Sequence, residues 1–288
     1  KESEVLVFGS FSTELFIPSS DVDLVLIGST GKDRMWKTAA ELRSHGGFQN
    51  IRVIANAKVP IVKFEDRVTS IPLDICFDVQ NGVKNTAYVR TQLEKYPQLK
   101  PLILVLKQFL HARELNDTHS GGIGSYLLLQ MLLSVIQRHP GVKLTHDTYV
   151  VETNVGALLL EFFNLYGLQF NYEKITISTR GEGAYMLKTD KGWQNYHQPY
   201  LLSVEDPCNP DSDLGKNSYA IGNVRRAFED AYFCLSTDPT ALGSILGWNL
   251  AISRPPRPRV HSVFKRLRRL QTTPVKESGG KRAVREEG

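Results

Sequence analysis

Three aspartates stand inside short apolar segments, where a charged side chain is unusual. Asp21 and Asp23 are separated by one valine and followed by Leu-Val-Leu, while Asp74 lies between a leucine and an isoleucine. Side chains alternate between the two faces of a strand, so we expect Asp21 and Asp23 to share one face and the valine and leucines to be buried on the other. Three carboxylates on one sheet face would destabilise the fold unless a cation compensated them. The pattern therefore predicts a divalent metal pair bound by Asp21, Asp23 and Asp74.

The donor atoms indicate which metal and which reaction. Oxygen-only ligands favour Mg²⁺ or Mn²⁺ over zinc, and such ions usually bind one or two carboxylates together with substrate phosphates. In a two-metal mechanism one ion activates an attacking hydroxyl, and the other holds a triphosphate and the leaving pyrophosphate. Gly9-Ser10 follows a strand-like run directly. This pair fits the chemistry, because glycine lets backbone N–H groups approach phosphate and the serine hydroxyl adds a contact.

The elements that must position these residues change character along the chain. Short β-rich runs occupy residues 4–8, 21–27, 51–55, 61–64 and 71–77, with one helical run at 35–44. Helical spacing follows at 83–95, 101–113, 124–138, 155–166 and 219–235, with a β-like stretch near 175–187. We therefore expect an α+β protein in which a mixed sheet with helices, at 1–80, precedes a mainly helical domain at 81–253.

The composition excludes several classes of protein. With 41% hydrophobic and 23% charged residues, the chain has an ordinary globular composition. Its most apolar stretch, residues 126–136, is interrupted by Gln130 and Ser134 and falls short of the roughly 20 residues of a membrane span, so we expect a buried helix and no membrane. The three cysteines form no C-x-x-C pair, which argues against a disulfide framework and a cysteine zinc site. An intracellular location, in nucleus or cytoplasm, fits best.

The net charge of +5 is distributed unevenly. Residues 254–288 hold 11 Lys/Arg against 3 Asp/Glu, which leaves 24 against 27 for residues 1–253. The segment 254–288 is therefore a basic tail that either binds a polyanion or a partner, or is simply solvated. Residues 1–253, the body of the chain, could therefore bind a polyanion only through a local basic groove.

Taken together, these residues resemble the nucleotidyltransferase fold of the DNA polymerase β superfamily, whose signature is Gly-Ser, then Asp-x-Asp, then a later single Asp. The resemblance narrows to noncanonical poly(A) polymerases of the TRAMP-complex type and covers about residues 4 to 250. The segments that carry it are VPIVK at 59–63, NG at 81–82, LKQFL at 106–110, GGIGSY at 121–126, EDP at 205–207 and DLG at 213–215. It implies a catalytic lobe and a helical central lobe, with ATP bound in the cleft between them.

The same resemblance implies a set of catalytic and phosphate-binding residues. Asp21, Asp23 and Asp74 would bind the metals, with Asp74 also helping to activate the RNA 3′ hydroxyl. Gly9 and Ser10 would hold the triphosphate.

It also implies further nucleotide-binding residues. Lys107 would meet a phosphate, although a lysine at the rim of a core helix is the alternative reading. Ser125 and Tyr126 open a helix, where N–H groups favour anions and the tyrosine ring could stack on the base, although a core aromatic is again possible.

The resemblance offers two candidates for the ribose contact and a separate loop for the base contact. Either Asn81 or Asn85 would bind the ribose, unless Asn81-Gly82 is simply a turn. Asp206 belongs to a nucleotide-recognition loop at about 199–218. In that loop Ser212 stands where relatives that prefer UTP tend to carry a histidine, which favours adenylation.

The expected function is therefore that of a template-independent RNA 3′-terminal adenylyltransferase, a poly(A) polymerase that uses two Mg²⁺ or Mn²⁺ ions to add AMP from ATP. A terminal uridylyltransferase or a transferase of mixed base preference is the enzymatic alternative. An inactive scaffold that binds RNA or protein is the alternative outside enzymes. The chain has no RNP aromatic motif and no zinc knuckle, so we expect an RNA-binding protein partner, as the resemblance also implies.

Overall fold

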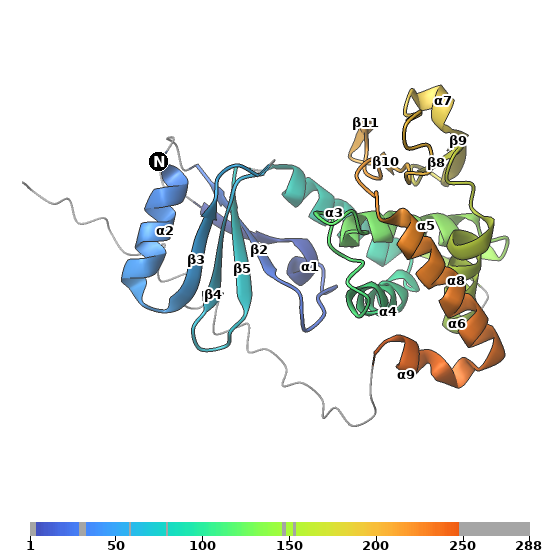
Figure 1. Ribbon diagram of the computed structural model, residues 1–288, viewed down its shortest axis with the longest axis horizontal. Helices are drawn as coiled ribbons and strands as arrows, with labels where there is room; N and C mark the ends of the chain where they lie inside the picture. Colours follow the sequence, from blue (N-terminus) through green and yellow to red (C-terminus); the bar gives the residue numbers. More distant parts are fainter. Residues whose placement is uncertain are drawn as a thin grey trace, which may run out of the picture. The chain divides into compact units, whose positions relative to one another are not determined.

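The computed structural model describes residues 4–28, 33–57, 59–78, 80–145, 148–151 and 154–247, and the expected basic tail at 254–288 lies outside them. The described chain divides into two compact units. The first contains residues 4–6 and Leu24–Asp78, and the second contains Val7–Asp23 and residues 79–247. The mixture of one larger sheet with helices and small hairpins confirms the expected α+β class (Figure 1).

A five-stranded sheet with the order β1-β2-β5-β4-β3 dominates the first unit. Its strands are β1 (Glu4–Phe8), β2 (Val22–Ile27), β3 (Phe48–Ile54), β4 (Ile61–Asp66) and β5 (Pro72–Phe77). Helix α2 (Arg34–His45) precedes β3 and ends at Gly46, whose φ of 69° gives the left-handed cap that glycine adopts without strain. All five strands were predicted from their apolar runs.

Strand β2 is an interior strand of the sheet, and its burial differs from the expected alternation. Val22 and Leu24 are buried, as predicted. Val25, on the opposite face, is also fully buried, while Leu26 is partly exposed. Burial along β2 therefore does not follow the expected period of two, and the expectation that Leu26 is buried was wrong.

The second unit is mainly helical. Its helices are α1 (Gly9–Ser12), α3 (Gln80–Lys95), α4 (Leu99–His111), α5 (Ser125–Arg138), α6 (Val155–Asn164), the π-helix η1 (Leu165–Gln169), α7 (Lys188–Lys191), α8 (Ile221–Thr237), the 3₁₀-helix η2 (Pro239–Ala241) and α9 (Leu242–Ile245). Three antiparallel hairpins accompany them: β6 (Val142–Thr145) with β7 (Thr148–Val151), β8 (Ile175–Ser178) with β9 (Ala184–Leu187), and β10 (Glu205–Asp206) with β11 (Asn209–Asp213).

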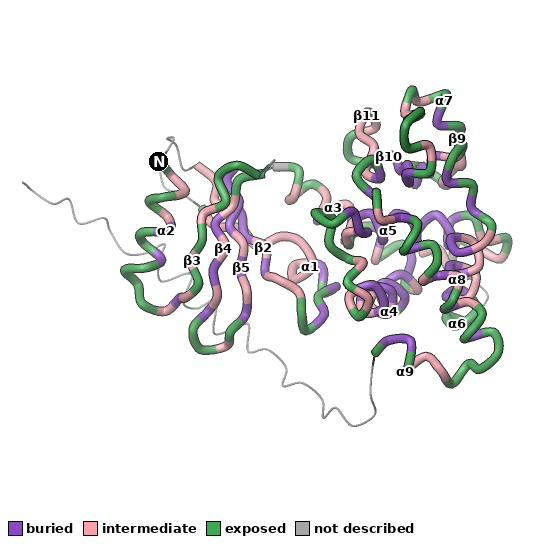
Figure 2. The backbone as a smooth tube through the Cα atoms, in the orientation of Figure 1, coloured by how far each residue is buried: buried purple, intermediate pink, exposed green. Residues whose placement is uncertain are grey.

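Helix α5 forms the centre of this unit, and Figure 2 shows it buried along most of its length. Every residue from 127 to 137 is buried, polar ones included. Ser134 Oγ lies 2.7 Å from Tyr166 Oη, and Gln130 Oε1 accepts a bond of 2.6 Å from Thr179 Oγ1. The expected buried helix is confirmed. Each of its two polar interruptions makes a hydrogen bond, but the buried Gln130 Nε2 has no partner among the described residues.

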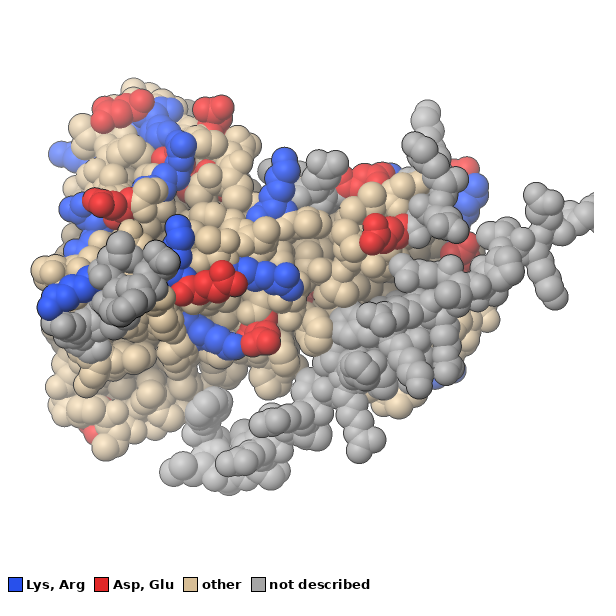
Figure 3. Space-filling model, turned by 180° about the vertical axis from the view of Figure 1, so that it is seen from behind, with Lys and Arg blue, Asp and Glu red and all other residues tan. Residues whose placement is uncertain are grey.

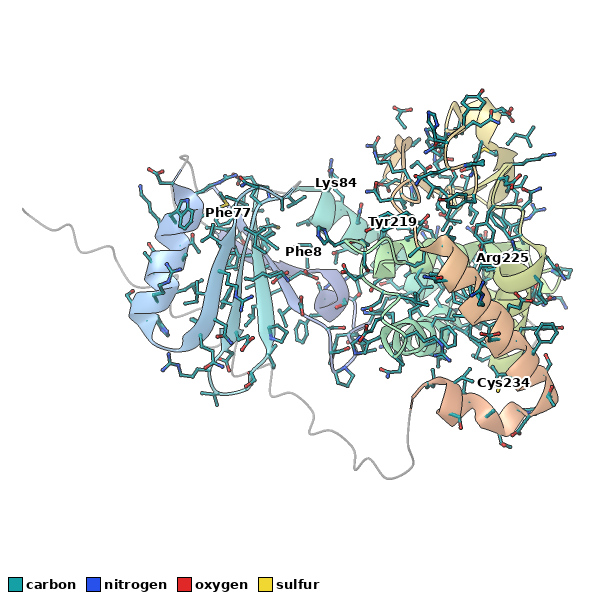
Figure 4. The ribbon with its side chains drawn as sticks, in the orientation of Figure 1. Phe8, Phe77, Lys84, Tyr219, Arg225 and Cys234 are labelled. Carbon is teal, nitrogen blue, oxygen red and sulfur yellow. The ribbon has the colours of Figure 1, made fainter. Side chains whose placement is uncertain are left out.

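The helix expected at 155–166 instead ends at Asn164 and continues as a π-helical turn. The turn contains Gly167, where an added Cβ would lie 2.6 Å from the backbone nitrogen of Glu229 on α8. Arg225 of α8, labelled in Figure 4, donates through Nε to the Gly167 carbonyl at 3.1 Å. Close approach of α8 therefore accompanies the change of helix type.

Across the described part of the chain, no helix combines the length and apolarity that a bilayer crossing requires.

Candidate active site

A cavity of about 480 Å³ lies within the second unit. Its walls come from two stretches of the chain, one inside Val7–Asp23 and the other between Gly82 and Leu129. Eight of the residues singled out from the sequence line it: Gly9, Ser10, Asp21, Asp23, Asn85, Lys107, Ser125 and Tyr126. The structure thus brings together side chains that are far apart in sequence.

Gly9 sits against one of the carboxylates. It has a φ of 68°, and a Cβ built on it would lie 2.1 Å from Asp23 Oδ2. Its backbone N–H donates to Thr86 Oγ1 at 2.9 Å, and that hydroxyl in turn donates to the Gly82 carbonyl at 2.8 Å. The missing side chain of Gly9 therefore makes room for the Asp23 carboxylate, and its amide joins the turn to helix α3.

Helix α3 presents one face to the cavity. Gly82, Asn85, Thr86 and Val89 line it, three or four residues apart, as one helical face requires. Asn81 is exposed and does not line the cavity, so of the two candidate asparagines the structure places only Asn85 there. The alternative that Asn81-Gly82 is a turn was wrong, because both residues belong to α3.

Two lining residues on this side were not anticipated. The first is Phe8, labelled in Figure 4: a Cβ added to Gly82 would lie only 2.6 Å from Cε2 of its ring. Thr86 is the second, and its place beside Asn85 could have been read from the spacing of Gly82, Asn85 and Val89 on α3. The contact of Thr86 with Gly9 could not, because it joins residues 77 positions apart.

Lys107 reaches the cavity from helix α4. Its side chain is almost fully buried, and Nζ donates to the Leu15 carbonyl at 2.6 Å. Burial lowers the pKa of the ammonium to about 8, against the opposing attraction of the Asp23 carboxylate. A cation held at a cavity wall, with one of its donors fixed, is suited to meeting an anionic group there.

Tyr126 links the first turn of α5 to the β10–β11 hairpin. Its hydroxyl donates to Asp206 Oδ1 at 3.1 Å, and burial together with that carboxylate raises its pKa. The ring of Tyr88 packs edge-on against it, with centroids 6.5 Å apart. Asp206 does not itself line the cavity but holds the tyrosine that does.

The segment around Asp206, which the sequence analysis expected to be a recognition loop, is more regular than a sequence rich in Pro, Asp and Asn suggests. Asp213 Oδ1 accepts from Val204 N at 2.9 Å and from Gly215 N at 2.8 Å, which closes the β10–β11 hairpin. Ser212 lies on β11. Glu205 is buried, with the guanidinium of Arg180 and the ammonium of Lys191 each 3.4 Å away.

Asp74 belongs to the other unit, on β5. It pairs with Lys63 of β4, the two residues standing opposite each other across the strands with Nζ and Oδ2 2.7 Å apart. Among the described residues no three His, Cys, Asp or Glu side chains form a group that could hold a metal. The three-carboxylate site stays a prediction.

The donors at the cavity nevertheless fit a hard divalent cation. Asp21 and Asp23 supply two carboxylates, and Ser10 and Asn85 add neutral oxygens. Mg²⁺ typically takes one or two protein carboxylates and completes its shell with water and substrate phosphates. These residues would hold such an ion better than a zinc ion, which prefers nitrogen and sulfur.

Comparison with known proteins shows that the chain is similar to poly(A) RNA polymerases. Residues 1–93 match the family described as "Poly(A) RNA polymerase, mitochondrial-like, central palm domain", and residues 154–212 match "Cid1 family poly A polymerase". Poly(A) RNA polymerase cid14 of Schizosaccharomyces pombe is 38% identical over 244 residues, which cover 83% of this chain and 35% of that protein. The chain thus spans about a third of the length of this relative and of the poly(A) RNA polymerase CID14 of Cryptococcus neoformans.

Two further comparisons bear on activity. An inactive noncanonical poly(A) RNA polymerase, protein Trf4-2 of Drosophila melanogaster, is 33% identical over 243 residues, or 81% of this chain and 58% of that protein. The polymerase core of TRAMP, an RNA surveillance complex, superposes with a TM-score of 0.74 at 30% identity, covering 85% of this chain and 80% of that structure. With this fold and these motifs, the chain belongs to the noncanonical poly(A) RNA polymerase family.

Proposed function

We propose that this chain is the catalytic core of a template-independent RNA 3′-terminal adenylyltransferase, which adds AMP from ATP to the 3′ end of RNA. The observation that carries the proposal is the cavity in which the Gly9-Ser10 turn, the Asp21 and Asp23 carboxylates and the Lys107 ammonium meet. A catalytically inactive scaffold would not require the close approach of the Asp23 carboxylate to Gly9. The inactive relative makes this distinction a matter for experiment.

Each residue has a role in the proposed reaction. Ser10 and Lys107 bind the triphosphate, and Asn85 binds the ribose. Asp21 and Asp23, with Asp74, hold two divalent cations, which when bound would neutralise charge on the triphosphate. Mg²⁺ and Mn²⁺ both suit these oxygen ligands.

The chemical step is an in-line displacement. The RNA 3′ oxygen forms a bond to the α-phosphorus as the bond to the β-phosphate bridging oxygen breaks, and pyrophosphate leaves. The hydroxyl proton passes toward Asp74, which we assign as the residue that helps activate the nucleophile. Lys107, held in place by the Leu15 carbonyl, stabilises the negative charge that pyrophosphate carries away.

Base choice rests on the far end of the cavity. The Tyr126 ring would stack on adenine, with its hydroxyl anchored on Asp206. Ser212 in place of a histidine favours ATP over UTP. RNA selection would require an RNA-binding protein partner, and the cysteine content suits an intracellular setting.

Incubating this chain with labelled oligo(A), Mg²⁺ or Mn²⁺ and each nucleoside triphosphate separately tests the proposal. We expect a ladder of products with ATP, and its loss in Asp21→Ala, Asp23→Ala and Asp74→Ala proteins that remain folded. Extension mainly with UTP would make the chain a uridylyltransferase. No extension with any triphosphate, while RNA still binds, would make it a scaffold.

A further inference from the structure

Lys188, at the start of α7, is a buried lysine that lies outside the cavity of the candidate active site. Its side chain is 3% exposed. Nζ donates to three main-chain carbonyls: Tyr172 at 2.6 Å, Pro199 at 2.9 Å and Leu201 at 2.6 Å. All three hydrogens of the ammonium are therefore used inside the protein.

Such an arrangement is costly unless every donor is satisfied. Burial lowers the pKa of Lys188, while the nearby Asp213 and Glu173 carboxylates favour its charge. Charge-assisted bonds to carbonyls are stronger than neutral ones, and three of them converge on one atom. Three carbonyls from two separate segments are thereby fixed around a single point.

The segment that Lys188 fixes leads directly to the base-recognition hairpin. Leu202 N donates to Ser218 Oγ at 3.0 Å and Ile177 N donates to the Ser203 carbonyl at 3.0 Å, which extends the anchored stretch along the chain. Glu205 and Asp206 follow as β10, and Asp206 accepts the hydroxyl bond of Tyr126. Contacts of β10 with β8, and of α7 with β9, keep these pieces together (Figure 1).

We propose that Lys188 is a positioning residue for nucleotide selection. Its ammonium holds the backbone of residues 199–206 in place, and through Asp206 it sets the orientation of the Tyr126 ring against the base. The inference rests on the proposed adenylyl transfer. Lys188 touches neither substrate nor the reacting atoms. Its effect should appear in nucleotide binding and discrimination, with the chemical step spared.

Lys188→Met tests this, because it keeps an apolar stem of similar length and removes all three donors. We expect the KM for ATP to rise roughly tenfold, which corresponds to a loss of about 1.4 kcal/mol of binding free energy, with kcat within about twofold. The ratio of kcat/KM for ATP to that for UTP should fall by a similar factor. Lys174→Met, the same substitution at an exposed lysine nearby, should change neither quantity.

Assays are run well below the melting temperature of each variant, which is measured separately. A folded Lys188→Met protein with unchanged KM and unchanged ATP preference would overturn the inference, even if its melting temperature fell. Should that variant not fold, Lys188→Gln replaces it, because glutamine keeps two N–H donors on a shorter side chain. Its KM for ATP and its ratio of kcat/KM for ATP to that for UTP are compared with the wild-type values, and unchanged values would overturn the inference. A wild-type chain that extends no primer would instead contradict the proposed function.

Discussion

At the scale of single residues, Gly9 combines two constraints that other residue types fail to meet together. Its φ of 68° lies in the left-handed region, and the Asp23 carboxylate occupies the space of a side chain. Gly46 shares the first constraint, with a φ of 69°, but has nothing within 4 Å of an added Cβ. The two glycines therefore separate backbone strain from displacement of a carboxylate.

Gly9→Ala should abolish primer extension, because the new methyl group has to displace Asp23. Gly46→Ala should leave extension near the wild-type rate. Both should lose on the order of 1–2 kcal/mol of stability from the left-handed backbone. Urea unfolding and extension assays on both proteins check this. Equal activity in the two variants would show that the contact between Gly9 and Asp23 is irrelevant to catalysis.

Lys107 makes a prediction about pH. With a pKa of about 8, it is charged in the free protein below that pH and neutral above it. We expect kcat/KM for ATP to fall as pH rises through about 8, because this parameter reports the free enzyme. Lys107→Met should lower kcat/KM by roughly 10- to 100-fold, the value of one charged hydrogen bond, and should remove this limb of the pH profile.

The free energy of unfolding should change with pH in the opposite direction to kcat/KM. The ordinary lysine pKa is 10.5, so between about 8 and 10.5 the unfolded chain binds more protons than the folded one. This group therefore makes the free energy of unfolding rise with pH across that window, and the contribution is absent in Lys107→Met. If the variant instead melts early with unchanged kinetics, Lys107 is a structural residue.

At the scale of elements, the strands that carry the aspartates were predictable because their apolar runs are local signals. Asp21 and Asp23 were predicted for the same reason, because a charge inside an apolar pattern is visible without the fold, whereas Lys107 was predicted from the family resemblance; all three line the cavity. The choice of Asn85 over Asn81 was not predictable, since it depends on where α3 begins. The β10–β11 hairpin was missed because Asp213 and Tyr126 stabilise it through contacts that periodicity does not report.

The packing of η1 against α8 supplies a prediction at this scale. Gly167→Ala should destabilise the protein by about 1–3 kcal/mol, because its methyl group would meet the α8 backbone at Glu229. Gly222→Ala, within α8 and with open space around it, should be neutral or stabilise by up to about 1 kcal/mol. Urea unfolding midpoints measure the difference. Similar effects at both positions would show that the close approach of η1 and α8 is unimportant.

At the scale of the whole molecule, charge is balanced over the body and concentrated in the tail. Figure 3 shows Lys/Arg and Asp/Glu side chains interspersed over the face it presents. The sequence count agrees, with 24 Lys/Arg against 27 Asp/Glu before residue 254 and 11 against 3 after it. A body of this kind should bind RNA weakly and in a salt-sensitive manner.

Removing residues 254–288 should therefore lower the affinity for oligo(A) and flatten its dependence on salt, while single-turnover addition on saturating primer stays unchanged. Titrations of labelled oligo(A) at two salt concentrations measure both quantities. Identical affinities and salt slopes with and without the tail would rule out an RNA role. A lower melting temperature without a change in RNA affinity would show that the tail contributes to stability and not to RNA binding.

The two stretches that line the cavity are joined by contacts that span 77 residues, from Gly9 to Thr86, and 92 residues, from Leu15 to Lys107. At ribosomal rates of about 5–20 residues per second, the early stretch waits roughly 4 to 20 seconds for these partners. Loop closure over such separations is also slow in refolding. In pulsed hydrogen exchange, the Gly9 amide should gain protection after the amides of α4 and α5, and earlier protection would contradict this order. Nascent chains would thus carry the Gly9 amide and the Leu15 carbonyl without these two partners, open to chaperones and proteases, until helix α4 has been synthesised.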